Sequence, residues 1–291
     1  MSLRAALLRT GFHTPVIVLV VGLLQLSPGH LPHRPALSSL ELQITSTTSS
    51  RPIDLAATTG TTTGFCQSVA DPAYYYPGST WDSALSGAPT LRYMVMNPAS
   101  GPGTAPDPSY VSAVASARKA GVEVLGYAPT TWGHRSSADV QADIDKYGQW
   151  YGVTSIFLDE AATGADQLPY YSALADYVHG RSGMTALNFG TVPVEGYLGF
   201  TDLAVTFEGS YADYRTAAFP SWTRNYPPTR FWHLVYETPR TAMSSALKKA
   251  RQASVANVFV TDDRGANPWD TLPTYWSREL LDIRSNNGAG C

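Results

Sequence analysis

Short apolar runs alternate with longer amphipathic segments from about residue 66 to the end of the chain. Apolar runs of about four to eight residues between turn-forming residues are typical of buried strands, and a recurrence every three to four positions is typical of helices. The pattern predicts strands at residues 73–76, 91–97, 123–127, 155–159, 185–188, 203–208, 231–236 and 257–261. It predicts helices at residues 108–120, 138–151, 169–180, 241–253 and 273–285.

Several predicted helix boundaries carry capping residues. Asp107, Ser137 and Thr241 stand at predicted N-termini, where a side-chain oxygen accepts a hydrogen bond from a free backbone N–H. Gly121 and Gly152 follow two of the predicted helices, and glycine readily adopts the left-handed conformation that ends a helix. The helix ends and the hydrophobic periodicity therefore agree.

The alternation of strands and helices predicts a (β/α)8 barrel. Strands that are separated by helices run parallel, and eight such units within residues 66–291 match the size of this fold. The rival is a doubly wound open sheet, which usually has a glycine-rich phosphate-binding turn after its first strand. Residues 76–80 read Tyr-Pro-Gly-Ser-Thr and lack that pattern. We therefore predict one barrel domain over residues 66–291.

The N-terminal part of the chain has a different composition. Arg4 and Arg9 precede an apolar stretch at residues 16–26, which is shorter than the ~20 residues of a membrane-spanning helix. We interpret residues 1–27 as a secretion signal; Pro15 and the lack of a clear cleavage motif leave an uncleaved N-terminal anchor as the alternative. Residues 28–65 are rich in Ser, Thr and Pro and are expected to form a flexible stalk. We expect the barrel to be secreted or displayed at the cell surface.

The chain has two cysteines, Cys66 at the start of the predicted domain and Cys291 at its last residue. In an exported protein the two can pair, because a barrel brings its first strand beside its last helix. The alternative is two unpaired thiols at the ends of the chain. The sequence leaves both readings open.

Composition and charge exclude several classes of function. A net charge of -3 and 15% charged residues give no basic face for nucleic acid. The six histidines, at positions 13, 30, 33, 134, 179 and 233, include no pair spaced for one helix face, so we expect no metal centre and no cofactor. A Gly-x-Ser-x-Gly motif is missing, which disfavours a serine esterase. We expect a monomer whose membrane contact, if any, is the N-terminal anchor.

Acidic side chains stand at the ends of two predicted strands. Asp159 and Glu160 end residues 155–160, and Glu208 ends residues 203–208. In (β/α)8 barrels, chemistry gathers at the C-terminal ends of the strands. Two carboxyl groups there provide the acid and the nucleophile or base that hydrolysis of a glycosidic bond requires. An Asp-Glu pair taken alone is more often a favourable charge at a helix N-terminus, but here both strand ends carry acids.

Other polar and aromatic residues follow the predicted strands and form a candidate substrate-binding ring. They are Tyr75, Tyr76, Asn97, Tyr127, Trp132, Asn188, Tyr236, Asp262 and Asp263. Amides suit sugar hydroxyls and aromatic rings suit sugar faces. Each has a plainer interpretation. The asparagines can be turn residues, and the two aspartates can cap the following turn or form a salt bridge with Arg264. About half of the aromatic residues are expected to serve core packing.

A series of motifs resembles the spherulation-specific family 4 (spherulin-4) proteins. In chain order the motifs lie at residues 76–79 with 81–82, 97–103, 124–127, 156–160, 187–191, 207–211, 260–263, and 267–270 with 273–276. They cover most of residues 69–285, and their order makes the resemblance specific. Phe189 departs from the family pattern, which has a smaller residue or proline at that point, and this bears on the floor of the site around Asn188.

The resemblance implies a (β/α)8 glycoside hydrolase. Relatives in the family are endo-acting enzymes on α-1,4-linked N-acetylgalactosamine or galactosamine polymers of biofilm matrix. By that resemblance Asp159, Glu160 and Glu208 match the essential acids. Related barrel families imply retention with Asp159 as nucleophile and Glu208 as acid/base, and the division of roles among the three acids stays open. Two alternatives stay open: a non-catalytic carbohydrate-binding or cell-wall protein on the same barrel, and a hydrolase of peptidoglycan or teichoic acid.

Overall fold

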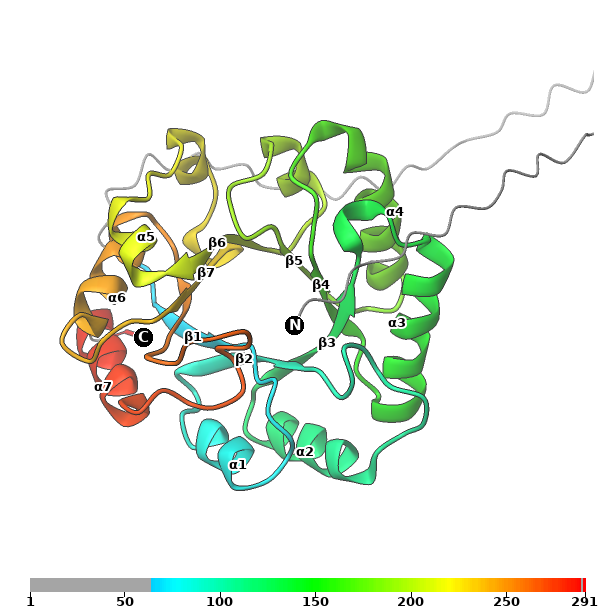
Figure 1. Cartoon of the computed structure of the whole chain (residues 1–291), viewed down its shortest axis with the longest axis horizontal. Helices are drawn as coiled ribbons and strands as arrows, with labels where there is room; N and C mark the ends of the chain where they lie inside the picture. Colours follow the sequence, from blue (N-terminus) through cyan, green and yellow to red (C-terminus); the bar gives the residue numbers. More distant parts are fainter. Residues whose placement is uncertain (1–63, 289) are drawn as a thin grey trace, which may run out of the picture. The chain divides into compact units, whose positions relative to one another are not determined.

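A computed structural model describes residues 64–288 and 290–291. Its strands form a closed, all-parallel barrel in the sequential order β1 to β8, and helices surround this ring (Figure 1). The predicted (β/α)8 barrel is therefore confirmed. The predicted signal or anchor at residues 1–27, and all of the predicted stalk except residues 64–65, lie outside the described residues. Among the residues described, no helix is long and apolar enough to cross a membrane.

The eight strands are short and mostly buried. Their bounds are β1 Ser68–Asp71, β2 Leu91–Met96, β3 Glu123–Pro129, β4 Ser155–Asp159, β5 Thr185–Asn188, β6 Leu203–Ser210, β7 Phe231–Tyr236 and β8 Asn257–Val260. Seven of them match the predicted strands to within two residues at either end. The prediction for the first strand was wrong, because residues 73–76 have an aromatic, strand-like composition whereas Ser68–Asp71 is too short to show any periodicity.

The helices cover the outside of the barrel. They are α1 Ser79–Leu85, α2 Pro108–Lys119, α3 Ser137–Tyr151, α4 Leu168–His179, α5 Tyr211–Thr216, α6 Met243–Gln252 and α7 Trp276–Asn287. Short 3₁₀ turns are η1 Thr131–Gly133, η2 Ala165–Gln167, η3 Glu195–Gly199, η4 Ser221–Asn225 and η5 Pro228–Arg230. The sequence analysis missed α1 and α5, because seven and six residues are too few to display a helical period.

The capping predictions hold in part. The Asp107 side chain accepts from the Ser109 N–H at 2.8 Å, and Gly152 ends α3 in the left-handed conformation at φ 65°. The α3 cap is Ser136 and not Ser137, and α6 begins after Ala242 without a cap from Thr241. Both corrections are shifts of one residue, which is the usual uncertainty of helix ends.

Large aromatic side chains fill the barrel. Phe157 of β4 packs edge-on against Trp232 of β7, with ring centroids 5.4 Å apart, and both side chains are fully buried. Complete burial of one such side chain stabilises the fold by about 1.5–3 kcal/mol. On the outside, a Cβ at Gly126 of β3 would lie 2.5 Å from the Tyr147 ring of α3, so the close approach of this helix requires glycine. The packed barrel interior is the rigid support on which the strand ends are held.

A disulfide joins Cys66 and Cys291, which are 225 residues apart, so the paired alternative is the one found. Beside it, the Asn287 side chain accepts from the Gln67 N–H and donates to the Gln67 carbonyl, both at 2.8 Å. Arg251 donates to the same Asn287 oxygen at 2.6 Å. The two ends of the domain are thus fastened together at the N-terminal end of the barrel.

Candidate active site

The end of β4 presents Asp159 and Glu160 at the C-terminal end of the barrel. Asp159 is the last residue of the strand and pairs in register with Pro129 of β3. Glu160 follows in the left-handed region at φ 52°, and its carbonyl accepts hydrogen bonds from the Trp132 N–H at 2.7 Å and the Thr130 hydroxyl at 2.9 Å. The backbone therefore turns sharply between the two acids and is held there by the loop after β3.

Glu208 comes from β6, which extends two residues beyond the predicted strand end. Val205 pairs with Trp232 and Phe207 pairs with His233, so Thr206 is an extra residue and forms a bulge. Bulges bend a strand and re-aim the side chains that follow. The Glu208 N–H is fixed by the Gly190 carbonyl at 2.9 Å. The bulge at Thr206 and the hydrogen bond to Gly190 together set the position of the Glu208 carboxylate.

One amide joins the two acids. The Asn188 Nδ2 at the end of β5 donates to Asp159 Oδ1 at 2.7 Å and to Glu208 Oε2 at 2.5 Å. Because both bonds meet at one nitrogen, these two carboxylate oxygens are at most the sum of the distances, 5.2 Å, apart. The Asn188 Oδ1 accepts from the Gly190 N–H at 3.0 Å, which fixes the amide so that its NH₂ group faces the acids.

Glu208 is partly buried, and the loss of solvent around its carboxyl group is the main reason why its pKa is raised. The negative charge of Asp159 raises it further, while hydrogen bonds from Asn188 and Trp269 oppose the rise. The Trp269 Nε1 donates to Glu208 Oε1 at 3.3 Å. A raised pKa favours the protonated carboxyl group, so Glu208 is suited to donate a proton.

Two tyrosines stand beside the acids. Tyr127 of β3 and Tyr74 of the loop after β1 contact each other edge-on, with centroids 5.4 Å apart. Burial, followed by the charge of Asp159, raises the pKa of each phenol, so both remain protonated hydrogen-bond donors. The sequence analysis named Tyr127 but missed Tyr74. Tyr75 and Tyr76 were predicted to line the site instead, because the first strand was predicted to begin five residues too late.

Those neighbours, Tyr75 and Tyr76, lie in different surroundings. Tyr75 is 6% exposed and its hydroxyl donates to Asp71 at 2.6 Å, so its ring belongs to the core. Tyr76 is 60% exposed, packs edge-on against Tyr110, and donates to Asp107 at 2.9 Å. Of the two, Tyr76 has a free aromatic surface.

Three further predicted residues hold loops. The Asn97 Oδ1 accepts from the Gly101 N–H at 3.0 Å, which closes a turn after β2. Asp262 accepts from the N–H of Thr274 at 2.9 Å and also from its hydroxyl. Asp263 accepts from the Arg264 N–H at 2.7 Å. The structure does not bring these side chains into hydrogen-bond contact with Asp159, Glu160 or Glu208.

Aromatic surface at this end of the barrel is provided by Trp132 and Tyr236. Trp132 lies in η1 with φ 52° and is 56% exposed. Tyr236 ends β7 and packs edge-on against Trp269, with centroids 5.9 Å apart. Trp269 comes from the long loop between β8 and α7, so no strand-end argument identifies it. Its only signal in the sequence is the family motif at residues 267–270.

The described residues contain no group of three or more His, Cys, Asp or Glu side chains arranged to hold a metal ion. His233 is buried, which lowers its pKa to about 3, and it is bonded to Tyr214 and Thr206 in the outer layer.

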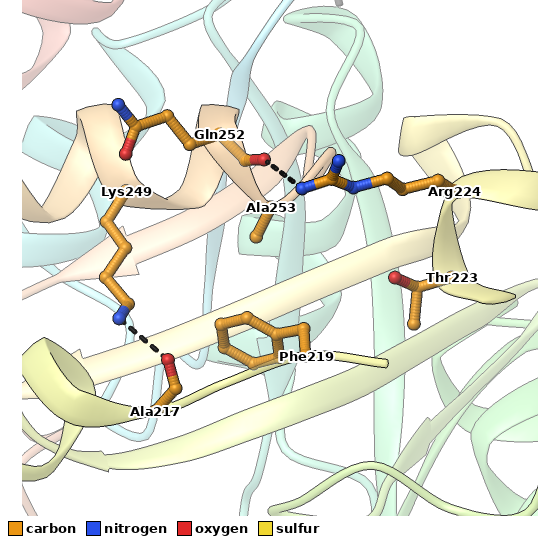
Figure 2. A pocket seen from close by; sticks show the side chains of 7 residues that line it. All are labelled: Ala217, Phe219, Thr223, Arg224, Lys249, Gln252 and Ala253. Carbon is orange, nitrogen blue, oxygen red and sulfur yellow. Dashed lines mark hydrogen bonds between the residues drawn. The ribbon is translucent and has the colours of Figure 1, made fainter. Parts of the chain in front are cut away.

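A cavity of about 180 Å³ lies on the outside of the barrel, between α6, η4 and the loop after α5 (Figure 2). Its two basic side chains already bind backbone carbonyls: Lys249 donates to Ala217 at 2.8 Å, and Arg224 donates to Gln252 at 3.4 Å. Its lining contains none of the acids described above. These two hydrogen bonds link α6 to the loop after α5 and to η4.

Comparisons with known proteins agree with this architecture. The model for spherulation-specific family 4 matches residues 68–282 of the chain. Spherulin-4 from Physarum polycephalum is 33% identical over an alignment 232 positions long, which covers 74% of this chain and 70% of that protein. The crystal structure of Aspergillus clavatus Sph3 in complex with GalNAc superposes with a TM-score of 0.66 at 26% identity, covering 77% of this chain and 99% of that one.

A more distant structure shares the barrel alone. It is active domain 2 of a thermostable chitinase from Pyrococcus furiosus, solved with chito-oligosaccharides. The TM-score is 0.50 at 13% identity, over 80% of this chain and 100% of that one. The same fold thus occurs in proteins that were crystallised with amino sugars.

Proposed function

Because the chain belongs to spherulation-specific family 4, we propose that it is a retaining glycoside hydrolase with Asp159 as nucleophile and Glu208 as acid/base. The observation that carries the proposal is the single Asn188 amide that binds both carboxylates and keeps their bonded oxygens at most 5.2 Å apart. Retaining enzymes place their two carboxyl groups about 5–5.5 Å apart, whereas inverting enzymes need about 6.5–9.5 Å for an intervening water.

In the first step, Glu208 gives its proton to the glycosidic oxygen as the bond to the anomeric carbon breaks. Asp159 forms an ester with that carbon. Asn188 donates to Asp159 Oδ1 and so orients the attacking carboxylate. In the second step, the Glu208 carboxylate takes a proton from water, whose oxygen displaces Asp159. Both groups then return to their starting protonation states, and the product keeps the anomeric configuration of the substrate.

Neighbouring residues supply binding groups for the sugar. Glu160 is assigned to a substrate hydroxyl or amino group, and the phenols of Tyr127 and Tyr74 act as donors beside the acids. The exposed rings of Trp132 and Tyr76 offer flat apolar surface for sugars on either side of the scissile bond. Tyr75, Asn97, Asp262 and Asp263 are omitted from this site, because their polar atoms serve the core or the loops.

The substrate we propose is an α-1,4-linked N-acetylgalactosamine or galactosamine polymer of the biofilm type, cut internally. The resemblance of the sequence motifs to the family supports this assignment, as does the similarity to Sph3, whose crystal structure contains GalNAc. We further propose that the enzyme acts outside the cell as a monomer, exported by the segment at residues 1–27. The disulfide is consistent with export, because disulfides persist in oxidising compartments.

Oligosaccharide release from a galactosamine-rich polymer tests the proposal. Wild type is expected to release oligosaccharides, and Asp159→Asn should reduce the rate at least about a thousandfold because the nucleophile is lost. Asp176→Asn, which changes an exposed acid on α4, is the matched control and should retain activity. Binding of the polymer without turnover by the wild type would favour a carbohydrate-binding protein instead.

A further inference from the structure

Trp269 contacts the proposed acid/base from outside the strand framework. It lies in the loop between β8 and α7, 61 residues beyond Glu208. Its indole N–H donates to Glu208 Oε1, while Asn188 donates to Glu208 Oε2. Each oxygen of the carboxylate thus accepts one N–H, and the two donors come from different parts of the barrel. A carboxylate held at both oxygens has a fixed orientation.

The indole itself is fixed on several sides. Its ring packs edge-on against Tyr236 at 5.9 Å and against Phe259 at 6.0 Å between centroids. The Trp269 carbonyl accepts from the Tyr74 N–H at 3.1 Å, and the Trp269 N–H donates to Asn267 Oδ1 at 3.2 Å. The residue therefore joins the loop after β1, the ends of β7 and β8, and the carboxylate of β6.

Burial separates Trp269 from a sugar-stacking residue. Only 5% of Trp269 is exposed, compared with 56% of Trp132. A stacking platform needs an open ring face, which Trp269 lacks. Any effect of Trp269 on the reaction must therefore pass through the groups that it contacts. Its indole N–H contacts Glu208 Oε1.

We propose that Trp269 is a positioning residue that orients Glu208 for proton transfer and sets its proton affinity. A donor to a carboxylate stabilises the charged form and lowers the pKa, against the upward effects of burial and Asp159. Trp269 thereby keeps Glu208 able to release its proton in the first step and to take one back in the second. The inference deepens the proposed function and rests on it for the catalytic consequence alone.

The chain offers a matched control in Trp276. This residue is 8% exposed, packs against the same Phe259 at 6.4 Å, and donates its indole N–H to the Ser83 carbonyl at 3.2 Å. Trp269→Phe and Trp276→Phe remove the same atoms from neighbouring positions. We expect Trp269→Phe to lower kcat about tenfold or more, to change KM little, and to shift the basic limb of the pH profile upward. Trp276→Phe should leave the pH profile in place.

A second measurement does not depend on turnover. The protein has seven tryptophans, so its indole N–H groups give few resonances in a ¹H–¹⁵N NMR spectrum. The Trp269 resonance, assigned by its loss in Trp269→Phe, should move with pH as Glu208 ionises and should stop moving in Glu208→Gln. The Trp276 resonance should not follow that titration.

The outcomes distinguish this inference from the proposed function. If the Trp269 resonance titrates with Glu208 but no polymer is cleaved, the positioning contact stands and the hydrolase assignment fails. If polymer is cleaved but the Trp269 resonance ignores Glu208, or both tryptophan variants have the same pH profile, the positioning role is overturned and the hydrolase assignment stands.

Discussion

The two ends of the barrel are formed by the same strands but satisfy their polar groups in different ways. At the N-terminal end, several polar side chains bind backbone groups. Asn287 pairs with both backbone groups of Gln67, and Arg230 donates to three backbone carbonyls. The disulfide closes this end.

At the C-terminal end, like charges and unusual backbone conformations gather. Asp159 and Glu208 share one amide donor, and Glu160, Trp132 and Glu237 all have φ 52°. A non-glycine residue in a sparsely populated backbone region costs about 1–3 kcal/mol. Such a cost persists where the surrounding structure supports it, and it is concentrated at functional sites.

Two further acids, Asp71 and Glu279, are buried in the barrel domain. Asp71 at the end of β1 is fully buried, and burial raises its pKa to about 7. Glu279 of α7 is also fully buried, and burial raises its pKa well above the usual range. We infer from the difference that contacts at the N-terminal end stabilise the fold, whereas the arrangement of acids at the C-terminal end destabilises it. Variants should therefore separate stability from turnover.

The largest expected effect concerns pH and Asp71. A folded-state pKa of about 7 lies above the ordinary aspartate pKa of 3.8, so the folded state is at its most stable below about pH 4 with respect to this group. Stability is lost as pH rises through about 7, by roughly 4 kcal/mol for three pKa units. Asp71→Asn should flatten the fall of Tm between pH 4 and 8. An unchanged slope, equal to that of Asp176→Asn, would contradict the assignment.

Removal of the disulfide between Cys66 and Cys291 tests the N-terminal end of the barrel. Replacing Cys66 and Cys291 together by alanine should lower the free energy of unfolding by about 2–5 kcal/mol, because the unfolded chain gains conformational freedom. Denaturant unfolding measures this loss. Below the transition, kcat should stay within about twofold of wild type, since the bond lies at the end of the barrel away from the acids. A large loss of kcat in the folded variant would show that the two ends are coupled.

Asn188→Ala removes the amide that bridges the acids. We expect kcat to fall about a hundredfold, the usual cost of losing one donor at a developing charge, and the pKa of Glu208 to rise further. Asn97→Ala is the control: Asn97 makes the same 3.0 Å bond to a backbone N–H after its strand, but no bond to an acid. Equal kinetics of the two variants would refute the bridging role.

The smallest effect is expected for Asn287→Ala. The variant loses two bonds to Gln67 and one from Arg251, and should lower the free energy of unfolding by about 1–3 kcal/mol. Steady-state kinetics on the polymer should be unchanged. If kcat falls with stability retained, the N-terminal end contributes to catalysis and the comparison fails.

The sequence predicts most of the fold because seven strands carry continuous apolar runs between turn residues. The strand Ser68–Asp71 was not predicted, because four residues are too few to show a period. The tyrosine-rich residues that follow it were predicted to be the strand instead. That error also explains why Tyr75 was named in place of Tyr74. A shift of one residue along a chain changes which side chain faces the site.

Two of the candidate acids were predictable because they lie at or near the ends of buried strands: Asp159 ends β4, and Glu208 lies two residues before the end of β6. The bridging role of Asn188 was not, since it depends on distances across three strands and on the bulge at Thr206. Trp269 reaches the site from a long loop whose path no periodicity reveals. The pairing of Cys66 with Cys291 likewise required the positions of both chain ends.

The central claim is that Asp159 and Glu208 act together as a retaining pair. The most direct measurement is the anomeric configuration of the first product from an α-linked substrate, followed by ¹H NMR before mutarotation. A retaining reaction releases the α-anomer first. Initial formation of the β-anomer would show inversion and contradict the roles assigned to these two residues.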